Sequence, residues 1–163
     1  MLKSLMKFAT VAVLAGVAGP VWADVFPYSN ARFGVTGLVP DGFIAQPAPA
    51  NGDGRMFVSP NGAVTVTIYG SYDAMGDLAA YRDFLFETYS DSGTVTYQAG
   101  GADWFVLSGL EAARVFYLRV KQGQTCAGDV AYAHLYVRYD EVARDQIDPI
   151  LGTLGRGLGF APC

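Results

Sequence analysis

The clearest hydrophobic pattern in the sequence is a series of three apolar stretches in its second half. They cover residues 104–108, 113–121 and 130–139, are rich in Val, Tyr, Phe and Leu, and contain no Pro. Residues of this kind favour pleated, half-buried strands. The connecting segments 109–112 and 122–129 are short enough for hairpins. The pattern therefore predicts three consecutive antiparallel strands.

Alternation places the side chains of these strands on two faces, because successive residues of a strand point in opposite directions. We expect Gly109 to pair with Ala112, and Lys121 with Val130. One face is then an ordinary apolar core made of Phe105, Phe116, Leu118, Val120, Ala131, Ala133, Leu135 and Val137. The other face is aromatic, basic at its edge, and consists of Trp104, Val106, Val115, Tyr117, Arg119, Tyr132, His134, Tyr136 and Arg138. A slip of one residue in a pairing would exchange the faces.

The rest of the chain reads as strands and two helical regions. Further strands are predicted at 32–39, 43–45, 56–59, 63–70 and 94–99, and residues 24–30 form a loose lead-in segment. A helix is predicted over 77–90, capped by Asp77. Residues 140–159 are a second helical region, in which Pro149 favours a main helix that starts at that residue. These elements predict an α+β fold, an antiparallel sheet flanked by helices.

Residues 1–23 have the pattern of a secretory signal peptide. Lys3 and Lys7 precede an apolar run over 8–18, and small residues follow up to Ala23. A membrane anchor is the alternative, but the run is shorter than the roughly 20 residues that a span needs. We therefore predict a signal peptide at 1–23, a single domain at 24–163 with no membrane span after cleavage, and a periplasmic or secreted location.

The mature chain is acidic. Loss of Lys3 and Lys7 leaves 9 basic residues against 15 acidic ones, a net charge of −6. An acidic chain without basic clusters argues against nucleic acid as a partner. Another exported protein is the partner class left open, and the sequence does not indicate an oligomeric state.

The two cysteines, Cys126 and Cys163, both lie in the exported part. In an oxidising compartment an even pair is most simply one disulfide. A loop of that length is stabilised by about 4 kcal/mol in the chain-entropy description. Zinc binding by the two cysteines with His134 is the alternative, but the spacing matches no familiar zinc site.

No cofactor or metal is expected. The turn Asn51-Gly52-Asp53-Gly54 invites comparison with a calcium loop, which needs oxygen ligands at alternate positions and a Glu at the twelfth. Arg55, Phe57 and Gly62 occupy those positions here. A plain Gly-rich turn is the better interpretation.

Several short motifs resemble one known family. They are Tyr28-Ser29-Asn30-Ala31-Arg32-Phe33-Gly34, Pro40-Asp41-Gly42-Phe43, Asn51-Gly52-Asp53-Gly54-Arg55, Phe57-Val58-Ser59-Pro60 and Trp104-Phe105-Val106-Leu107-Ser108-Gly109. Together with the order of elements, they resemble the PsbP-like α/β/α sandwich, and above all secreted proteobacterial proteins of that type. The resemblance implies an accessory or docking domain without enzymatic activity, and no catalytic residue to transfer.

Two functional hypotheses remain from the residues themselves. The first is a non-enzymatic accessory or protein-binding domain, for which Tyr117, Arg119, Tyr132, His134, Tyr136 and Arg138 are the candidate binding residues, since Tyr and Arg are frequent in interface centres. The alternative is a small periplasmic hydrolase or ligand-binding protein that uses the same face. His134 is the only histidine available as a base, and it lies mid-strand without a recognisable nucleophile motif. A helix packed over this face would instead make its tyrosines part of the core.

Overall fold

The computed structural model describes residues 24–163, and the predicted signal peptide lies outside the described residues. The larger sheet, called the central sheet below, contains β3 (Ile44–Ala45), β4 (Gly54–Val58), β5 (Val64–Tyr72), β6 (Gly93–Gly100), β7 (Trp104–Glu111), β8 (Arg114–Gln124) and β9 (Val130–Tyr139). A small sheet contains β1 (Val25–Ser29), β2 (Val35–Pro40) and β10 (Gly159–Phe160). The helices are α1 (Leu78–Ser92), the short 3₁₀ helix η1 (Glu141–Ala143) and α2 (Arg144–Arg156).

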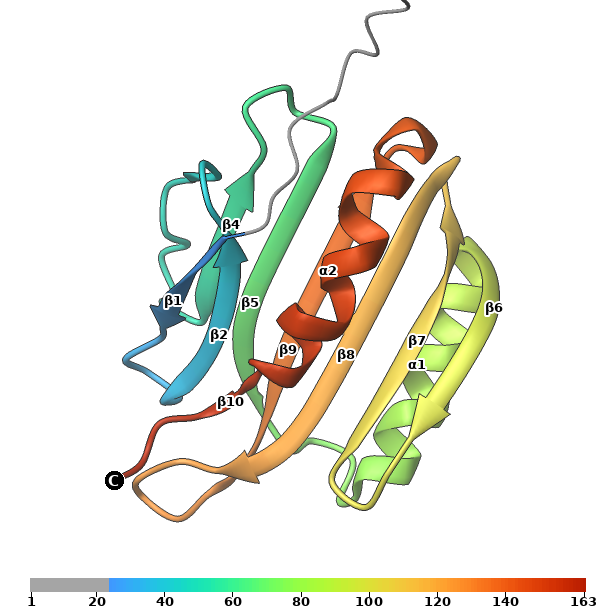
Figure 1. The fold of residues 1–163 in the computed structure, drawn as a ribbon. Coiled ribbons are helices and arrows are strands. Elements are labelled where there is room, and N and C mark those ends of the chain that lie inside the picture. Colours follow the sequence, from blue (N-terminus) through green and yellow to red (C-terminus); the bar gives the residue numbers. More distant parts are fainter. Residues whose placement is uncertain (1–23) are drawn as a thin grey trace, which may run out of the picture.

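The elements are stacked in layers. The central sheet is antiparallel throughout, with the strand order β3-β4-β5-β9-β8-β7-β6, and the small sheet has the order β1-β2-β10. α2 crosses one face of the central sheet beside the small sheet, and α1 lies against the other face (Figure 1). The α+β class and the helix-flanked antiparallel sheet predicted from the sequence are therefore confirmed.

The face covered by α2 and the small sheet, called the α2 face, carries the larger core. Its fully buried side chains include Val64, Val66, Ile68, Ala133, Leu135 and Val137 from the sheet, and Ile147 and Leu154 from α2. Gly155 allows α2 to approach closely, because a Cβ at this position would lie 2.9 Å from the Tyr117 hydroxyl. α2 and the small sheet, side by side, close this core.

The opposite face, called the α1 face, has a smaller core. Its buried residues are Phe105, Leu107, Phe116, Leu118, Val120 and Tyr132, packed against Leu78, Tyr81, Leu85, Phe86 and Tyr89 of α1. No residue of α1 is itself fully buried. The Asp77 carboxylate accepts a hydrogen bond from the Ala80 backbone N–H at 2.7 Å, so the predicted cap is confirmed.

Both predicted hairpin registers are wrong. Glu111 pairs with Arg114 around a two-residue turn, Ala112–Ala113, in which both residues have positive φ. β8 continues three residues beyond the expected end, so Gln124 pairs with Val130. The first shift is even and leaves the faces unchanged, but the second is odd. The predicted division of β8 and β9 between two faces therefore fails.

Two further elements differ from the prediction. Residues 25–29 form a strand, not a loose lead-in, because β1 is an edge strand of the small sheet, where Pro27 needs no hydrogen-bonding partner for a backbone N–H. α2 starts at Arg144, and Pro149 lies inside it. The carbonyl that loses its bond to Pro149 belongs to Asp145, and both residues are exposed, so water can satisfy it.

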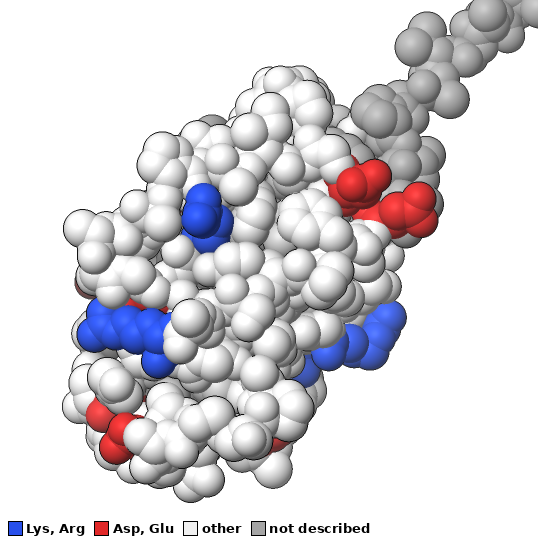
Figure 2. Space-filling model, turned by 90° about the vertical axis from the view of Figure 1, so that its left-hand side faces the viewer, with Lys and Arg blue, Asp and Glu red and all other residues white. Residues whose placement is uncertain are grey.

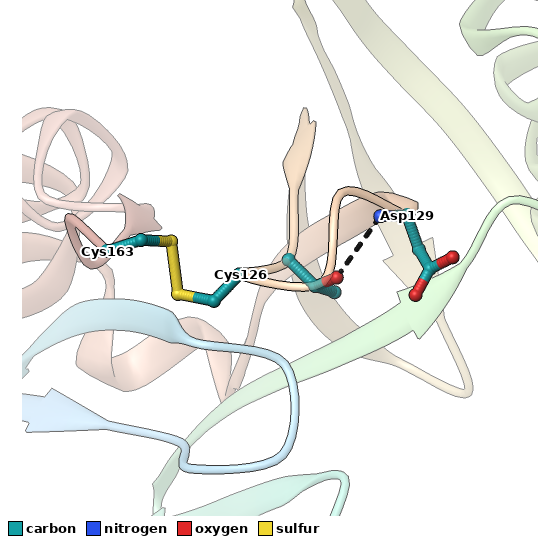
Figure 3. Close-up of a disulfide and its surroundings, with 4 residues drawn as sticks. Cys126, Asp129 and Cys163 are labelled. Atoms are coloured by element: carbon teal, nitrogen blue, oxygen red, sulfur yellow. Dashed lines mark hydrogen bonds between the residues drawn. A yellow bond between two sulfur atoms is a disulfide. The ribbon is translucent and has the colours of Figure 1, made fainter.

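The predicted pairing of Cys126 with Cys163 is confirmed (Figure 3). The two Cα atoms lie 5.5 Å apart. The bond joins the loop between β8 and β9 to the segment after β10, and within that loop the Thr125 hydroxyl accepts a hydrogen bond from the Asp129 backbone N–H at 3.3 Å. The C-terminal segment is thereby fastened across the end of the α2 face. No helix among residues 24–163 combines the length and the apolar character that crossing a bilayer requires.

Candidate functional site

The six candidate binding residues lie on two faces, not one. Tyr117 and Arg119 are on the α2 face, whereas Tyr132, His134, Tyr136 and Arg138 are on the α1 face. The odd shift in the β8–β9 register is the reason, because it reverses the faces of β9 relative to β8. The single aromatic and basic face inferred from the sequence does not exist. A binding role for any of these residues stays a prediction.

His134 lies in a buried aromatic cluster beneath α1. Its ring stacks on Tyr69 with 4.2 Å between the ring centroids, and its Nε2 lies 2.9 Å from the Tyr81 hydroxyl. The Tyr81 ring stacks in turn on the fully buried ring of Tyr132. Burial lowers the pKa of His134 to about 4, so the ring is neutral near pH 7. An inaccessible neutral histidine is part of the core, and the candidate base of the hydrolase hypothesis does not reach solvent.

Tyr136 and Arg138 of β9 contact the carboxylate of Glu111, the last residue of β7. The Tyr136 hydroxyl donates a hydrogen bond of 2.9 Å to Glu111, and the Arg138 guanidinium lies 3.5 Å from the same carboxylate. Burial raises the pKa of Tyr136, so its hydroxyl stays protonated and acts as a donor. Tyr89 of α1 packs beside Tyr136. The Ser92 hydroxyl at the end of α1 donates a hydrogen bond of 3.3 Å to Glu111, so this contact and the Tyr89 ring fasten the last turn of α1 to the sheet.

Tyr117 and Arg119 have a comparable role under the other helix. The Arg119 guanidinium lies over the Trp104 ring, 4.1 Å from its centroid, and the Tyr117 hydroxyl lies against Gly155 of α2. Such a cation–π contact holds the arginine side chain along the sheet. Tyr117 and Tyr136 are therefore half-buried, each under a different helix.

An apolar cleft lies where α1 does not cover the sheet. β3, β4 and the start of β5 have no helix over the α1 face, and Ile44 and Met56 are 58% and 44% exposed there. A cleft of about 420 Å³ opens over these strands and is lined by Gln46, Pro47, Pro49, Asn51, Asp53, Gly54, Arg55, Met56, Thr67 and Tyr69. Its volume is in the range of small-ligand and peptide-anchor sites. The side of the molecule that carries β1 and β4 shows few charged side chains (Figure 2).

One wall of the cleft is the segment 46–53, called the wall loop below, and two sequence motifs meet to hold it. The Asn30 amide donates a hydrogen bond of 2.7 Å to the Gly52 carbonyl. Arg32 donates to the Asn51 carbonyl at 2.6 Å and forms an ion pair with Asp53. The motif at 28–34 therefore anchors the motif at 51–55.

Glycine is required at two positions of the second motif. Gly52 has φ +68°, in the left-handed region that glycine adopts without strain. Gly54 has no room for a side chain, because a Cβ would lie 2.2 Å from the Ile68 carbonyl oxygen. The Arg55 guanidinium donates to the Gln46 carbonyl at 2.9 Å and fixes the other end of the loop. The cleft is thus formed in advance of any ligand.

Sequence reasoning interpreted residues 51–54 as a plain turn and placed the motif at 28–34 in the lead-in segment and the first strand, and it missed the cleft beside them. The cleft depends on the pairing of Asn30 and Arg32 with polar groups of the wall loop. No local pattern in the sequence indicates that pairing, since the partners are about 20 residues apart. The exposure of Met56 depends on where α1 ends, which the strand pattern does not reveal.

Neither a family model nor a curated protein matches the sequence, whereas solved structures do match the fold. Cyanobacterial PsbP from Synechocystis sp. PCC 6803 superimposes with a TM-score of 0.63 at 13% identity, covering 92% of this chain and 98% of that one. The Ran-binding protein Mog1p of Saccharomyces cerevisiae gives a TM-score of 0.57 at 11% identity, covering 84% and 95%. The fold is PsbP-like.

A third PsbP-like structure, LpqN of Mycobacterium tuberculosis, gives a TM-score of 0.57 at 15% identity and covers 85% of this chain and 91% of its own. It is described as involved in cell envelope biogenesis. At these identities the likeness establishes the fold and transfers no residue role. The predicted PsbP-like architecture is confirmed.

Proposed function

We propose that the mature chain is an exported, non-enzymatic accessory domain that binds another exported protein through the cleft beside the wall loop. The observation that carries the proposal is the cleft itself, an apolar depression with a fixed wall on a part of the sheet that no helix covers. Exposed apolar surface rimmed by polar groups marks interaction sites in soluble proteins.

Two further observations support binding over catalysis. His134, the one histidine, is fully buried behind Tyr69 and Tyr81, so it cannot act as a base on a bound substrate. Among the structures with this fold, Mog1p is named for binding Ran, and LpqN for a role in the cell envelope. Export is supported by the signal pattern at residues 1–23 and by the disulfide.

Site-specific photo-cross-linking in cells that export the protein tests this proposal. A photoreactive amino acid at Met56 is expected to give a discrete cross-linked product, because this side chain is exposed in the cleft. The matched control carries the same photoreactive amino acid in place of Tyr97 on β6. Tyr97 is 57% exposed at the far edge of the sheet. No product from Met56, or equal products from both positions, would refute the proposal.

The same preparation tests export. The mature chain is expected to begin at Asp24, because the small-residue cleavage pattern ends at Ala23. N-terminal sequencing of protein released from the periplasm measures this directly. If residues 1–23 are retained, the segment is a membrane anchor and not a cleaved signal peptide.

A further inference from the structure

The lining of the cleft indicates the chemistry of its occupant. Pro47 and Pro49 form one side, and Met56 and Tyr69 contribute a flexible thioether and a flat ring. Rigid rings and adaptable thioethers suit an apolar ligand that lies along the surface. The wall loop and the edge of the sheet leave the depression open to solvent, so a chain can enter and leave it.

The charged side chains of the lining are already engaged within the protein. Asp53 pairs with Arg32 and also accepts a hydrogen bond from the Asn51 amide. Arg55 donates to the Gln46 carbonyl. A charged ligand would have to compete with these contacts, so the cleft fits a neutral ligand.

Two hydroxyl groups in the lining have no partner within residues 24–163. Thr67 and Tyr69 both line the cleft, and neither hydroxyl makes a hydrogen bond there or is fully enclosed. Burial raises the pKa of Tyr69, so its hydroxyl stays a donor. The lining therefore offers hydroxyl donors beside apolar surface, which matches a ligand with carbonyl acceptors on an apolar body.

We infer that the cleft beside the wall loop binds an extended, neutral, proline-containing peptide segment of the partner. This inference rests on the proposed function and names the ligand class of the same site. Proline lacks a backbone N–H, so such a segment presents carbonyl acceptors with few donors. Its polyproline II conformation exists before binding, which reduces the entropy lost in the complex. Thr67 and Tyr69 donate to its carbonyls, and its rings lie against Pro47, Pro49 and Met56.

A titration of the ¹⁵N-labelled mature protein tests the inference with a defined probe, the nonapeptide acetyl-(Pro-Pro-Ala)₃-amide. Saturable binding with Kd below about 1 mM is expected. Amide shifts are expected in the wall loop and at Met56, Thr67 and Tyr69. The matched peptide acetyl-(Ser-Ser-Ala)₃-amide is expected to bind at least about tenfold more weakly, because it has no rings and more donors.

Three variants refine the result. Met56→Glu is expected to reduce affinity at least about tenfold by placing a charge in the apolar lining. Tyr69→Phe keeps the stack on His134 and is expected to reduce affinity roughly three- to tenfold through the lost hydroxyl. Tyr97→Phe on β6 is the control and is expected to bind as the unchanged protein does. Far-UV circular dichroism confirms that each variant is folded.

The outcomes separate this inference from the proposed function. No binding, equal binding of both peptides, or shifts at β6 instead of the cleft would overturn the inference. So would stronger binding of the apolar amphiphile octyl glucoside at the same amides, because the ligand class would then be lipid-like. If Met56 still cross-links a protein in any of these cases, the proposed function stands and only the peptide class fails. If Met56 gives no cross-link, the proposed function fails as well.

Discussion

The two faces of the central sheet are built from the same kinds of residues and differ in what covers them. On the α2 face, a helix and a second sheet close the core, and Ile147 and Leu154 of the helix are completely buried. On the α1 face a single helix covers part of the sheet, and none of its residues is completely buried. The closed face holds the larger core, and the partly covered face leaves apolar side chains exposed, where we propose that a partner binds.

On the α2 face, we expect the C-terminal disulfide to make the largest single contribution to the free energy of unfolding. Replacing Cys126 and Cys163 together by Ala is expected to cost about 4 kcal/mol, because the bond closes a loop with a sequence separation of 37. Urea unfolding of the oxidised protein and the variant measures the difference. A cost below about 1 kcal/mol would show that packing, not the bond, holds the C-terminal segment.

The two helices should respond differently to the same truncation. Leu154→Ala in α2 is expected to lower the free energy of unfolding by about 3 kcal/mol, because the side chain is fully buried. Leu85→Ala in α1 is expected to cost roughly half as much, because that side chain is only partly buried. Chemical denaturation of both variants measures the ratio. Equal losses would contradict the contrast between the faces.

His134 should make the stability of the α1 face depend on pH. Its pKa is about 4 in the fold and about 6.5 when unfolded, so the unfolded chain binds the extra proton between these values. The contribution of the neutral His134 ring to the free energy of unfolding is therefore fully present above pH 6.5, and it is lost as the pH falls toward 4. The wild type is expected to lose about 3 kcal/mol more than His134→Gln between pH 7.5 and pH 4.

The glutamine variant is the control for this comparison, because its amide can still accept a hydrogen bond from Tyr81 and does not titrate. Subtracting its pH profile removes the contributions of the carboxylates, which both proteins share. Parallel profiles would show that folding leaves the pKa of His134 unchanged, against the lowering that its complete burial implies.

The smallest effect that we expect concerns the turn between β7 and β8. Ala112 and Ala113 have φ of 47° and 63°, a conformation that costs alanine free energy in both positions. Asn and Gly favour such two-residue turns. The double substitution Ala112→Asn with Ala113→Gly is expected to raise the unfolding free energy by about 1 kcal/mol. The melting midpoint checks it, and a lower midpoint would contradict the backbone description of this turn.

The same turn shows how far sequence reasoning reaches in this protein. Strand composition and the Asp77 cap predicted most elements within a few residues, because those signals are local. Gly109 was expected to begin the hairpin, but two alanines form it, and no local preference indicates that choice. β8 continues for three residues beyond its predicted end, and this shifts its register against β9. That shift alone places Tyr117 and Arg119 on the opposite face from the other four candidate residues. The cleft depends on contacts between distant motifs.

The measurement that tests the central claim most directly combines stability and capture in one variant, Met56→Glu. Because Met56 is exposed on the uncovered part of the α1 face, we expect its melting midpoint to stay within about 2 °C of the unchanged protein. Cross-linking from a photoreactive residue at Ile44, on the same uncovered strands, is expected to disappear at the same time. A clearly lower midpoint would mean that Met56 belongs to the core. An unchanged midpoint with undiminished cross-linking would mean that the partner binds elsewhere.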